Sequence, residues 1–482
     1  MSVTTADSAL AQAKELLRII HKDRPRLQRI DRYERGDHDD PYMPPHASDE
    51  YRLLAKRSVS NWMGVLISTP VQAMYVDNFR RGQAAVRGSD GAALPEWTHW
   101  QNSRLDARQT SVHRGAVKFG HSFTITEKTD KGTRTKGLSA LNTSALWEDP
   151  ANDDAPVVAL TITQEAAEGS RGKARMWDGA LEYEVTFGAL LDDDSLTVTE
   201  VGKHGNSECP VTRFAAHIDL EGRTVGVVEP LIPLQDRINQ TIMDLLVAQS
   251  YTAHVVRYTT GMAPPLKMVP VKDESGEVVD WQPERGPDGR PIPANINVNS
   301  SRFLFAEDPD VRFGSLEGGP LSGFIESIDM SIRHLAAIGQ MPPHHLLGQI
   351  ANLSAEALLA AETALSRKVE EFRKLMGEAW ERVFRLAAEL EGVEASALDY
   401  SGEVIWRDME MRSLAQSADG LGKLREQLAI PVKGLWARVP GVTKNELDQW
   451  SALAEQENAD LQLVDALLRS TGEDPADGRE SR

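Results

Sequence analysis

The sequence predicts a mostly helical α+β protein built from several structural units, and three observations support this. First, 482 residues exceed what one hydrophobic core usually holds, which favours two or three units. Second, apolar residues alternate with a period of two between Val117 and about Ile218, as they do in strands. Third, they recur every three to four residues over long stretches of the C-terminal half, as in amphipathic helices. Strands and helices therefore occupy separate parts of the chain.

The bulk composition narrows the class of protein. With 41% apolar and 26% charged residues the chain has the composition of a folded globular protein, and its single cysteine excludes an internal disulfide and fits a reducing compartment. No apolar run of 18 residues occurs, so we expect no membrane span and no membrane partner. The formal net charge is −19, from 53 basic and 72 acidic residues. An ordinary reader of duplex DNA is basic, so this balance argues against one, although it suits a surface past which DNA slides.

The N-terminal region is predicted to be helical. The first 35 residues form a helix whose apolar face includes Leu16 and Ile20, and whose polar face is basic. That face indicates either a contact with an acidic partner or neighbouring subunit, or a solvated surface. Its basic residues are Lys14, Arg18, Lys22, Arg24, Arg26, Arg29, Arg32 and Arg35. One further helix is predicted over about Asp49–Ile67, and another follows Pro95.

One antiparallel sheet is predicted after these helices. Clusters of Gly, Asp and Asn separate runs rich in β-branched and aromatic residues, which is typical of strands and turns. The predicted strands are Phe119–Glu127, Val157–Gln164, Leu181–Leu190, Leu196–Val201 and Val211–Ala216. We expect the sheet and the preceding helices to form a mixed α/β unit over residues 1–228.

Two helices, over 229–253 and 321–338, are predicted to flank a small non-helical lobe. The first begins at Glu229-Pro230, where proline removes no helical hydrogen bond. Residues 254–320 are rich in proline and contain short strand-like pieces, so we expect a separate β-containing lobe there.

A loop over 339–353 leads into the longest predicted helix, over 354–392. Apolar residues recur in alternating steps of three and four along it, and Gly392 lies just past its end. About 38 residues make a rod of roughly 57 Å. By itself such a stripe indicates core packing or a coiled coil. Residues 393–482 are predicted to be helical over Arg412–Leu428 and Lys444–Leu468, with a disordered tail from Thr471.

The sequence holds no convincing catalytic motif. Gly115–Ser122 nearly matches a phosphate-binding loop, but His121 replaces the lysine, and the segment joins a helix to a strand instead of a strand to a helix. The adjacent His344 and His345 are expected to project in different directions and so not to form a zinc site. The Asp37–Asp40 turn has the residue types of a hard-cation site without its spacing, and we interpret it as a surface turn. We therefore expect no enzyme, no catalytic residue, no cofactor and no bound metal.

The order of elements, together with a set of local segments, resembles the portal proteins of tailed double-stranded DNA bacteriophages, of the long non-contractile-tailed type. The similarity covers roughly residues 10–465. The first two segments that carry it are Tyr33-Glu-Arg-Gly36 and NWMGVLISTPVQAM, which a predicted helix over Leu53–Val71 enters. The other three are RGAVKFGHSFTIT at Arg114–Thr126, EPLIPLQDRINQTIMDLLVAQSY at Glu229–Tyr251, and GQMPPHHLLGQIANLSAEALLAAETALSRKVEEF at Gly339–Phe372.

This resemblance implies a ring, commonly of twelve subunits, around an axial DNA channel at one capsid vertex. It divides the chain into a wing (1–228), a stem (229–253 and 321–338), a clip (254–320), a tunnel loop (339–353), a long wing and crown helix (354–392) and a helical crown (393–482). The implied partners are other copies of the chain, double-stranded DNA without sequence specificity, a large terminase ATPase, a head–tail connector or adaptor protein, and the major capsid and scaffolding proteins. The implied location is the virion, after assembly in the host cytoplasm.

Candidate DNA-facing residues follow from the resemblance and the charge. We hypothesise that the tunnel loop makes weak contacts through the polar residues Gln340, His344, His345, Gln349 and Asn352. Channel-facing stem residues are hypothesised to be acidic: Asp236, Asp244, Glu326 and Asp329. Acid in the lumen disfavours phosphate capture and leaves a low-friction passage. The loop contains no Arg or Lys, so firm electrostatic gripping of DNA there is not expected.

Two alternatives stay open at this point. The first is a different virion or cytoplasmic scaffold that assembles through the long helix as a coiled coil, which predicts an elongated particle of two or four subunits. The second is an enzyme with an unrecognised site at Asp37–Asp40 or at His344-His345, which predicts metal-dependent hydrolysis.

Overall fold

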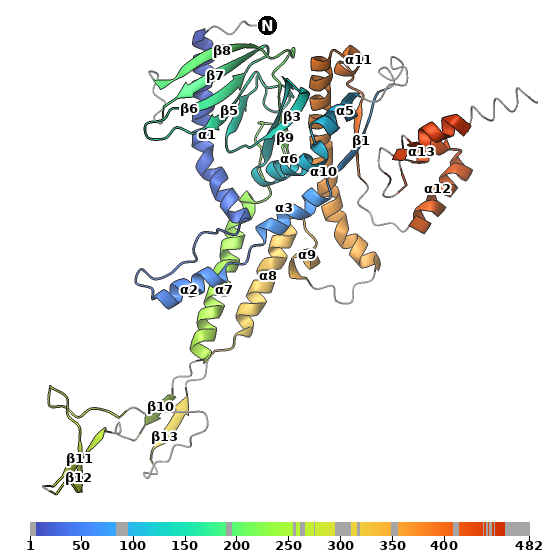
Figure 1. Ribbon diagram of the computed structural model, residues 1–482. Coiled ribbons are helices and arrows are strands. Elements are labelled where there is room, and N and C mark those ends of the chain that lie inside the picture. The colour runs from blue at the N-terminus through green and yellow to red at the C-terminus, as the bar shows by residue number, and fades with distance from the viewer. Residues whose placement is uncertain are drawn as a thin grey trace, which may run out of the picture. The chain divides into compact units, whose positions relative to one another are not determined.

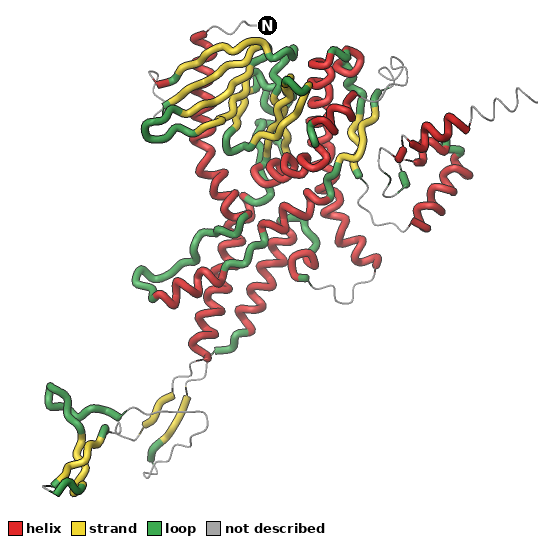
Figure 2. The backbone as a smooth tube through the Cα atoms, viewed as in Figure 1, coloured by secondary structure: helices red, strands yellow, loops and turns green. Residues whose placement is uncertain are grey.

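The computed structural model of the chain is drawn in Figures 1 and 2. It comprises two compact units, which we describe separately. The first unit comprises residues 1–39, 59–238 and 330–482, and the second comprises 40–58 and 239–329. The residues that the structure describes are 6–82, 95–188, 195–253, 257–260, 266–273, 275–294, 310–315, 319–348, 355–407, 414–436, 438–439, 442, 446–447 and 449–457. Helices and strands both contribute, as predicted, and helix predominates.

The N-terminal helices differ from the prediction at one place. Helix α1 (Ala6–Glu34) agrees with it, but the single helix predicted over 49–67 is wrong: α2 (Asp49–Ser58) and α3 (Met63–Gln72) are separate. The break occurs because Asn61 Oδ1 accepts hydrogen bonds from the backbone amides of Met63, at 3.0 Å, and Gly64, at 3.4 Å. A side-chain oxygen that accepts hydrogen bonds from the first backbone amides of a helix favours the start of a new helix at that point.

The basic face of α1 is largely engaged within the chain. Arg24 pairs with Glu165 at 2.6 Å, and Arg26 pairs with Glu229 at 2.6 Å. Arg29 and Arg32 both contact Asp39, each at 2.8 Å. The sequence suggested either that this face contacts an acidic partner or subunit, or that it is a solvated surface. It did not predict that these arginines form ion pairs within the chain. They fasten α1 to neighbouring segments of its own unit.

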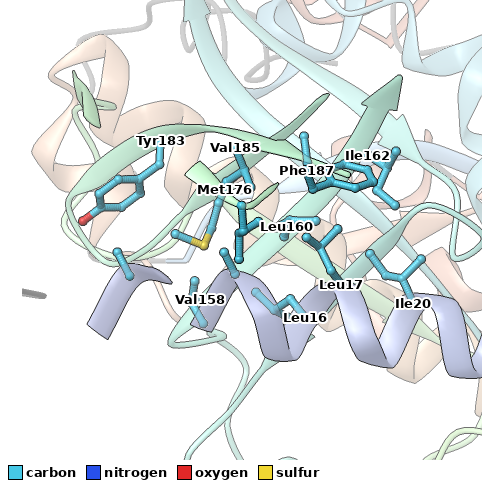
Figure 3. Packing of buried hydrophobic residues seen from close by; sticks show 14 residues of the cluster. Leu16, Leu17, Ile20, Val158, Leu160, Ile162, Met176, Tyr183, Val185 and Phe187 are labelled. Atoms are coloured by element: carbon cyan, nitrogen blue, oxygen red, sulfur yellow. The ribbon is translucent and has the colours of Figure 1, made fainter. Parts of the chain in front are cut away.

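A five-stranded antiparallel sheet packs on α1. Its strands lie in the order β4 (Thr143–Leu146), β5 (Val158–Gln164), β6 (Gly172–Trp177), β7 (Leu181–Phe187) and β8 (Thr197–Lys203). Leu16, Leu17 and Ile20 of the helix meet side chains such as Leu160 and Phe187 of the sheet in one buried cluster (Figure 3). Burial of these side chains from water holds the helix against the sheet.

A second sheet makes the prediction of one sheet wrong. It is three-stranded, in the order β3 (Gly132–Leu138), β2 (His121–Thr129) and β9 (Val211–Ala215), and α6 (Leu105–Phe119) contacts all three strands. The sequence reasoning missed β3 because its Gly, Thr and Lys residues show no apolar alternation. It missed β4 and β6 as well.

Helix α10 (Ala355–Glu391) is the central element of the first unit. It confirms the predicted long helix and, at 37 residues, is about 56 Å long. Its buried side chains contact β2, β3, β9 and the short helix α5 (Pro95–Asn102). The apolar stripe is therefore core packing within the unit. The fully buried Trp380 lies against Trp100 and Phe214, with ring centroids 5.0 and 4.6 Å apart.

The C-terminal part is not purely helical, which departs from the prediction. After α11 (Glu394–Ala397), strand β14 (Glu403–Trp406) pairs antiparallel with β1 (Val76–Arg80). Helices α12 (Leu414–Leu428) and α13 (Val432–Trp436) follow. The predicted helix over 444–468 is described only in part, and the predicted disordered tail lies outside the described residues.

The second unit contains the predicted non-helical lobe. Helices α7 (Ile232–Ala253, preceded by the 3-10 turn η2, Glu229–Leu231) and α8 (Ser322–Ile338) confirm the predicted pair and have residues in both units. Between them the described residues form two antiparallel strand pairs and no helix. These pairs are β10 (Arg257–Thr260) with β13 (Arg312–Ser315), and β11 (Met268–Lys272) with β12 (Val278–Pro283).

No helix among the described residues is long and apolar enough to cross a membrane.

Candidate functional site

The four acidic stem candidates fall into two environments. Asp236 accepts a hydrogen bond from Tyr33 Oη at 2.5 Å and lies 3.5 Å from Arg29, and its side chain is 36% exposed. Burial, followed by the hydrogen bond to Asp236, raises the pKa of Tyr33, so the phenol stays a donor. Asp236 is thus held against α1 and its charge is partly balanced.

The other three acidic candidates are exposed and belong to the second unit. Asp244 lies one helical turn after Gln240 and accepts a hydrogen bond from Gln240 Nε2 at 3.0 Å. Glu326 and Asp329 are three residues apart on α8, so they project from the same side of that helix. These carboxylates carry negative charge on the solvent-facing sides of α7 and α8.

The segment predicted as a loop over 339–353 is more structured than expected. Gln340 adopts a left-handed backbone with φ of 52°, which ends α8, and its side chain is exposed. A short helix, α9 (Pro343–Leu347), follows, so the prediction of an irregular segment is wrong there. Proline at the first helical position favours that turn, and Gly348 ends it with φ of 66°. Gln349 and Asn352 lie outside the described residues.

The two histidines of α9 converge, which corrects the expectation that they diverge. His344 Nε2 lies 3.0 Å and His345 Nε2 2.9 Å from the same oxygen, Oε1 of Glu362 on α10. Sequence reasoning missed Glu362 because only the fold brings residues 17 and 18 positions apart in the chain to one point.

A lysine from outside the segment also reaches it. Lys368 Nζ on α10 donates a hydrogen bond to the carbonyl oxygen of Gly339 at 2.7 Å. Burial lowers the pKa of Lys368 to about 8. Lys368 therefore joins the start of the segment to α10. Because the segment itself contains no Arg or Lys, its residues alone did not predict a cation here.

The two other sequence candidates for chemistry have structural roles. Asp39 pairs with Arg29 and Arg32; burial opposes its ionisation, but hydrogen bonds from the two guanidinium groups outweigh that and lower its pKa. His121, in the near match to a phosphate loop, begins strand β2 directly after α6, as the helix-to-strand prediction requires. Its Nδ1 lies 2.8 Å from Thr224 Oγ1, within the unit. Within the described residues, neither place gathers three His, Cys, Asp or Glu ligand atoms as a metal site requires.

Comparison with known proteins places these features in one family. The sequence matches the family described as Phage portal protein, SPP1 Gp6-like, over residues 13–460. It is 28% identical to the portal protein of Mycobacterium phage D29 over 371 residues, which cover 73% of this chain and 71% of that protein. It is also 28% identical to the portal protein of Mycobacterium phage L5 over 369 residues, covering 74% and 70%.

The family match spans nearly the whole chain and includes α7, α8, the segment with α9 and all of α10. Proteins of this family are structural, non-enzymatic components of the phage head, which agrees with the expected lack of enzymatic chemistry. The scaffold and enzyme alternatives are thereby set aside. The chain belongs to the SPP1 Gp6-like phage portal proteins and has the function of a bacteriophage portal protein.

Proposed function

We propose that this chain assembles into a ring, with twelve subunits as the expected number, that forms the double-stranded DNA channel at one capsid vertex. In this proposal residues 1–228 are the wing, 229–253 and 321–338 the stem, 254–320 the clip, 339–353 the tunnel loop, 354–392 the long helix, and 393–482 the crown region. The ring passes DNA during packaging and ejection. Its proposed partners are a terminase ATPase, a head–tail connector protein, and the capsid and scaffolding proteins.

One observation carries the ring proposal beyond family membership. In the β11–β12 pair, apolar side chains are exposed on both strands, including Val279 at 67% and Trp281 at 56%. An isolated two-stranded pair is at best marginally stable in water. Exposed apolar side chains on such a pair are expected to be covered in the assembled state, and in a closed ring the covering surface is a neighbouring subunit.

The first prediction tests assembly. Purified full-length protein is expected to form a ring with a mass near twelve times 53.1 kDa, about 640 kDa, and a central hole in negative-stain images. Light scattering after size-exclusion chromatography measures the mass. A stable monomer under all conditions contradicts the proposal, and an elongated particle of two or four subunits revives the scaffold alternative.

A matched pair of variants tests the proposed contact. A tryptophan buried at an interface commonly contributes about 2 kcal/mol or more, so Trp281→Asp is expected to weaken subunit association roughly thirtyfold. The control, Leu220→Asp, changes a side chain that is 89% exposed in the first unit and is expected to leave the ring intact. If both variants assemble like the unaltered protein, the β11–β12 pair is not an interface.

The second prediction concerns charge in the proposed channel. Reversing Asp244, Glu326 and Asp329 together to lysine changes the charge by six per subunit, roughly seventy per ring of twelve. Lysines along a channel hold phosphates, so the amount of DNA packaged per particle is expected to fall roughly tenfold while rings of normal size still form. A terminase-driven packaging assay with nuclease protection measures this.

The control for charge itself reverses three exposed acidic residues in the strands and turns of the two sheets of the first unit, Asp130, Glu168 and Glu200. This variant has the same net charge and is expected to package normally. Equal packaging by both variants contradicts the placement of the three stem carboxylates in the channel.

A further inference from the structure

Three potential metal ligands meet between α9 and α10. His344 Nε2 and His345 Nε2 lie 3.0 and 2.9 Å from Glu362 Oε1, and the ligand atoms of the three residues all lie within 4.8 Å of one another. No other such group of three His, Cys, Asp or Glu residues occurs in the part of the chain that the structure describes. The cluster belongs entirely to the first unit.

The two histidines meet here although they are neighbours in a helix. Adjacent residues of a helix point about 100° apart, so their side chains normally separate. In α9 the two imidazoles instead contact each other edge to face, with centroids 4.6 Å apart and planes at 62°. Glu362 approaches from α10, so that both Nε2 atoms reach one carboxylate oxygen. Gly348 ends the helix by donating its amide to the carbonyl oxygen of His344 at 3.0 Å.

The spacing is close to that of a tetrahedral zinc site. Zinc binds imidazole nitrogen at about 2.0–2.1 Å and carboxylate oxygen at about 2.0–2.2 Å, so tetrahedral geometry separates two ligand atoms by roughly 3.3 Å. The two nitrogen-to-oxygen distances here are a few tenths of an ångström shorter. A small outward rotation of the side chains, with loss of the two imidazole hydrogen bonds, makes room for an ion.

Burial is also suitable for an exchangeable ion. The exposed fractions of the His344, His345 and Glu362 side chains are 11%, 28% and 31%. The ligands are held by two helices, yet solvent can reach the cluster, so an ion can enter and a water can complete its coordination. Two imidazoles and one carboxylate favour a borderline transition-metal ion, whereas Mg²⁺ and Ca²⁺ prefer oxygen ligands throughout.

We propose that His344, His345 and Glu362 bind one divalent transition-metal ion per subunit, with Zn²⁺ the preferred metal. The ion clamps α9 to α10. Two imidazole nitrogens and one carboxylate oxygen supply three ligands, and water supplies the fourth. This inference goes beyond the proposed channel function and does not depend on it.

The third prediction is zinc binding by the full-length protein. Protein stripped with a chelator and then titrated with Zn²⁺ in a calorimeter is expected to bind about one ion per subunit, and elemental analysis after desalting measures the retained zinc. His344→Ala, His345→Ala and Glu362→Gln are each expected to weaken binding roughly tenfold or more, since changes even outside the ligand shell commonly cost that much. Circular dichroism checks that each variant is folded.

The matched control is His217→Ala. His217 lies 3.7 Å from Glu371, also on α10, but forms a pair with one imidazole only. This variant is expected to bind zinc like the unaltered protein. Two outcomes overturn the proposal. Either the unaltered protein takes up no zinc, or the three ligand variants take up as much zinc as His217→Ala does.

A second measurement separates a clamp from incidental binding. Zinc is expected to slow hydrogen exchange at the Gly348 amide, which closes α9, in the unaltered protein but not in Glu362→Gln. Unchanged exchange in both proteins contradicts the clamp. Because ring mass is measured independently, rings that form without binding zinc would overturn this inference and leave the proposed function standing.

Discussion

Replacing Arg382 by methionine is expected to lower the free energy of unfolding by about 3–5 kcal/mol, the usual cost of disrupting a buried, hydrogen-bonded charge. Arg382 lies on α10 with only 3% of its side chain exposed. Its guanidinium donates to the carbonyl oxygens of Cys209 at 2.7 Å and Val211 at 2.8 Å, and to Thr212 Oγ1 at 2.7 Å. Methionine fills a similar length but leaves these acceptors without a donor.

Chemical denaturation followed by far-ultraviolet circular dichroism measures this loss. The control is Arg367→Met on the same helix, where the arginine is exposed and the change is expected to cost less than about 0.5 kcal/mol. A loss below about 1 kcal/mol for Arg382→Met would mean that water replaces the guanidinium, and that α10 is not fastened to β9 by this residue.

Acid is expected to destabilise the first unit between pH 6.5 and 4. His99 and His113 are buried, and burial lowers the pKa of each from 6.5 to about 4. His113 Nδ1 donates to the carbonyl oxygen of Met74 at 3.2 Å, so its Nε2 must accept the indole hydrogen of Trp380 at 2.9 Å. If Nε2 were protonated, its N–H would point at the indole N–H of Trp380, and two donors would oppose each other. The folded state therefore keeps the imidazole of His113 neutral.

The sign follows from proton uptake. Below pH 6.5 the unfolded chain binds protons that these folded histidines do not, so stability is full above pH 6.5 and falls until the pH reaches about 4. At 1.36 kcal/mol per unit, the loss between pH 6.5 and 5 is about 2 kcal/mol for each histidine. Denaturant midpoints measured from pH 8 to 4 give this profile.

Two variants assign the acid effect. His113→Gln removes one of three histidines whose pKa is lowered by burial to about 4, the third being His121, and is expected to flatten the profile by about a third, although the variant is less stable at every pH. His46→Gln, which replaces an exposed histidine, is expected to leave the profile unchanged. A profile that stays equally steep in His113→Gln would show that other groups cause the acid sensitivity.

The elements that the sequence predicted well are those whose signal is local. The bounds of α8 and α10 differ from the predicted ones by one residue, because each has a long apolar stripe with terminal signals such as Gly392. The missed elements lack such a signal. Strand β14 exists because it pairs with β1, more than 300 residues earlier, and β3, which pairs with the neighbouring β2 across a short turn, shows no apolar alternation.

The candidate site shows the same division. The sequence identified the acidic residues of α7 and α8, and three of the four stem candidates are exposed carboxylates. It did not show that Tyr33 and Arg29 hold Asp236, nor that Glu362 and Lys368 reach the segment before α10. Each of these contacts joins residues that no local pattern relates.

The sequence by itself determined the class of fold, the order of the long helices, the acidic balance and the portal resemblance, because periodicity, charge and family motifs are written along the chain. Only the tertiary structure decided that the strands form two sheets, that α10 is a core helix and not a coiled coil, and that His344 and His345 converge on Glu362. The physical reason is that a helix or strand signal depends on neighbours in the chain, whereas hydrogen bonds, ion pairs and ligand clusters depend on neighbours in space.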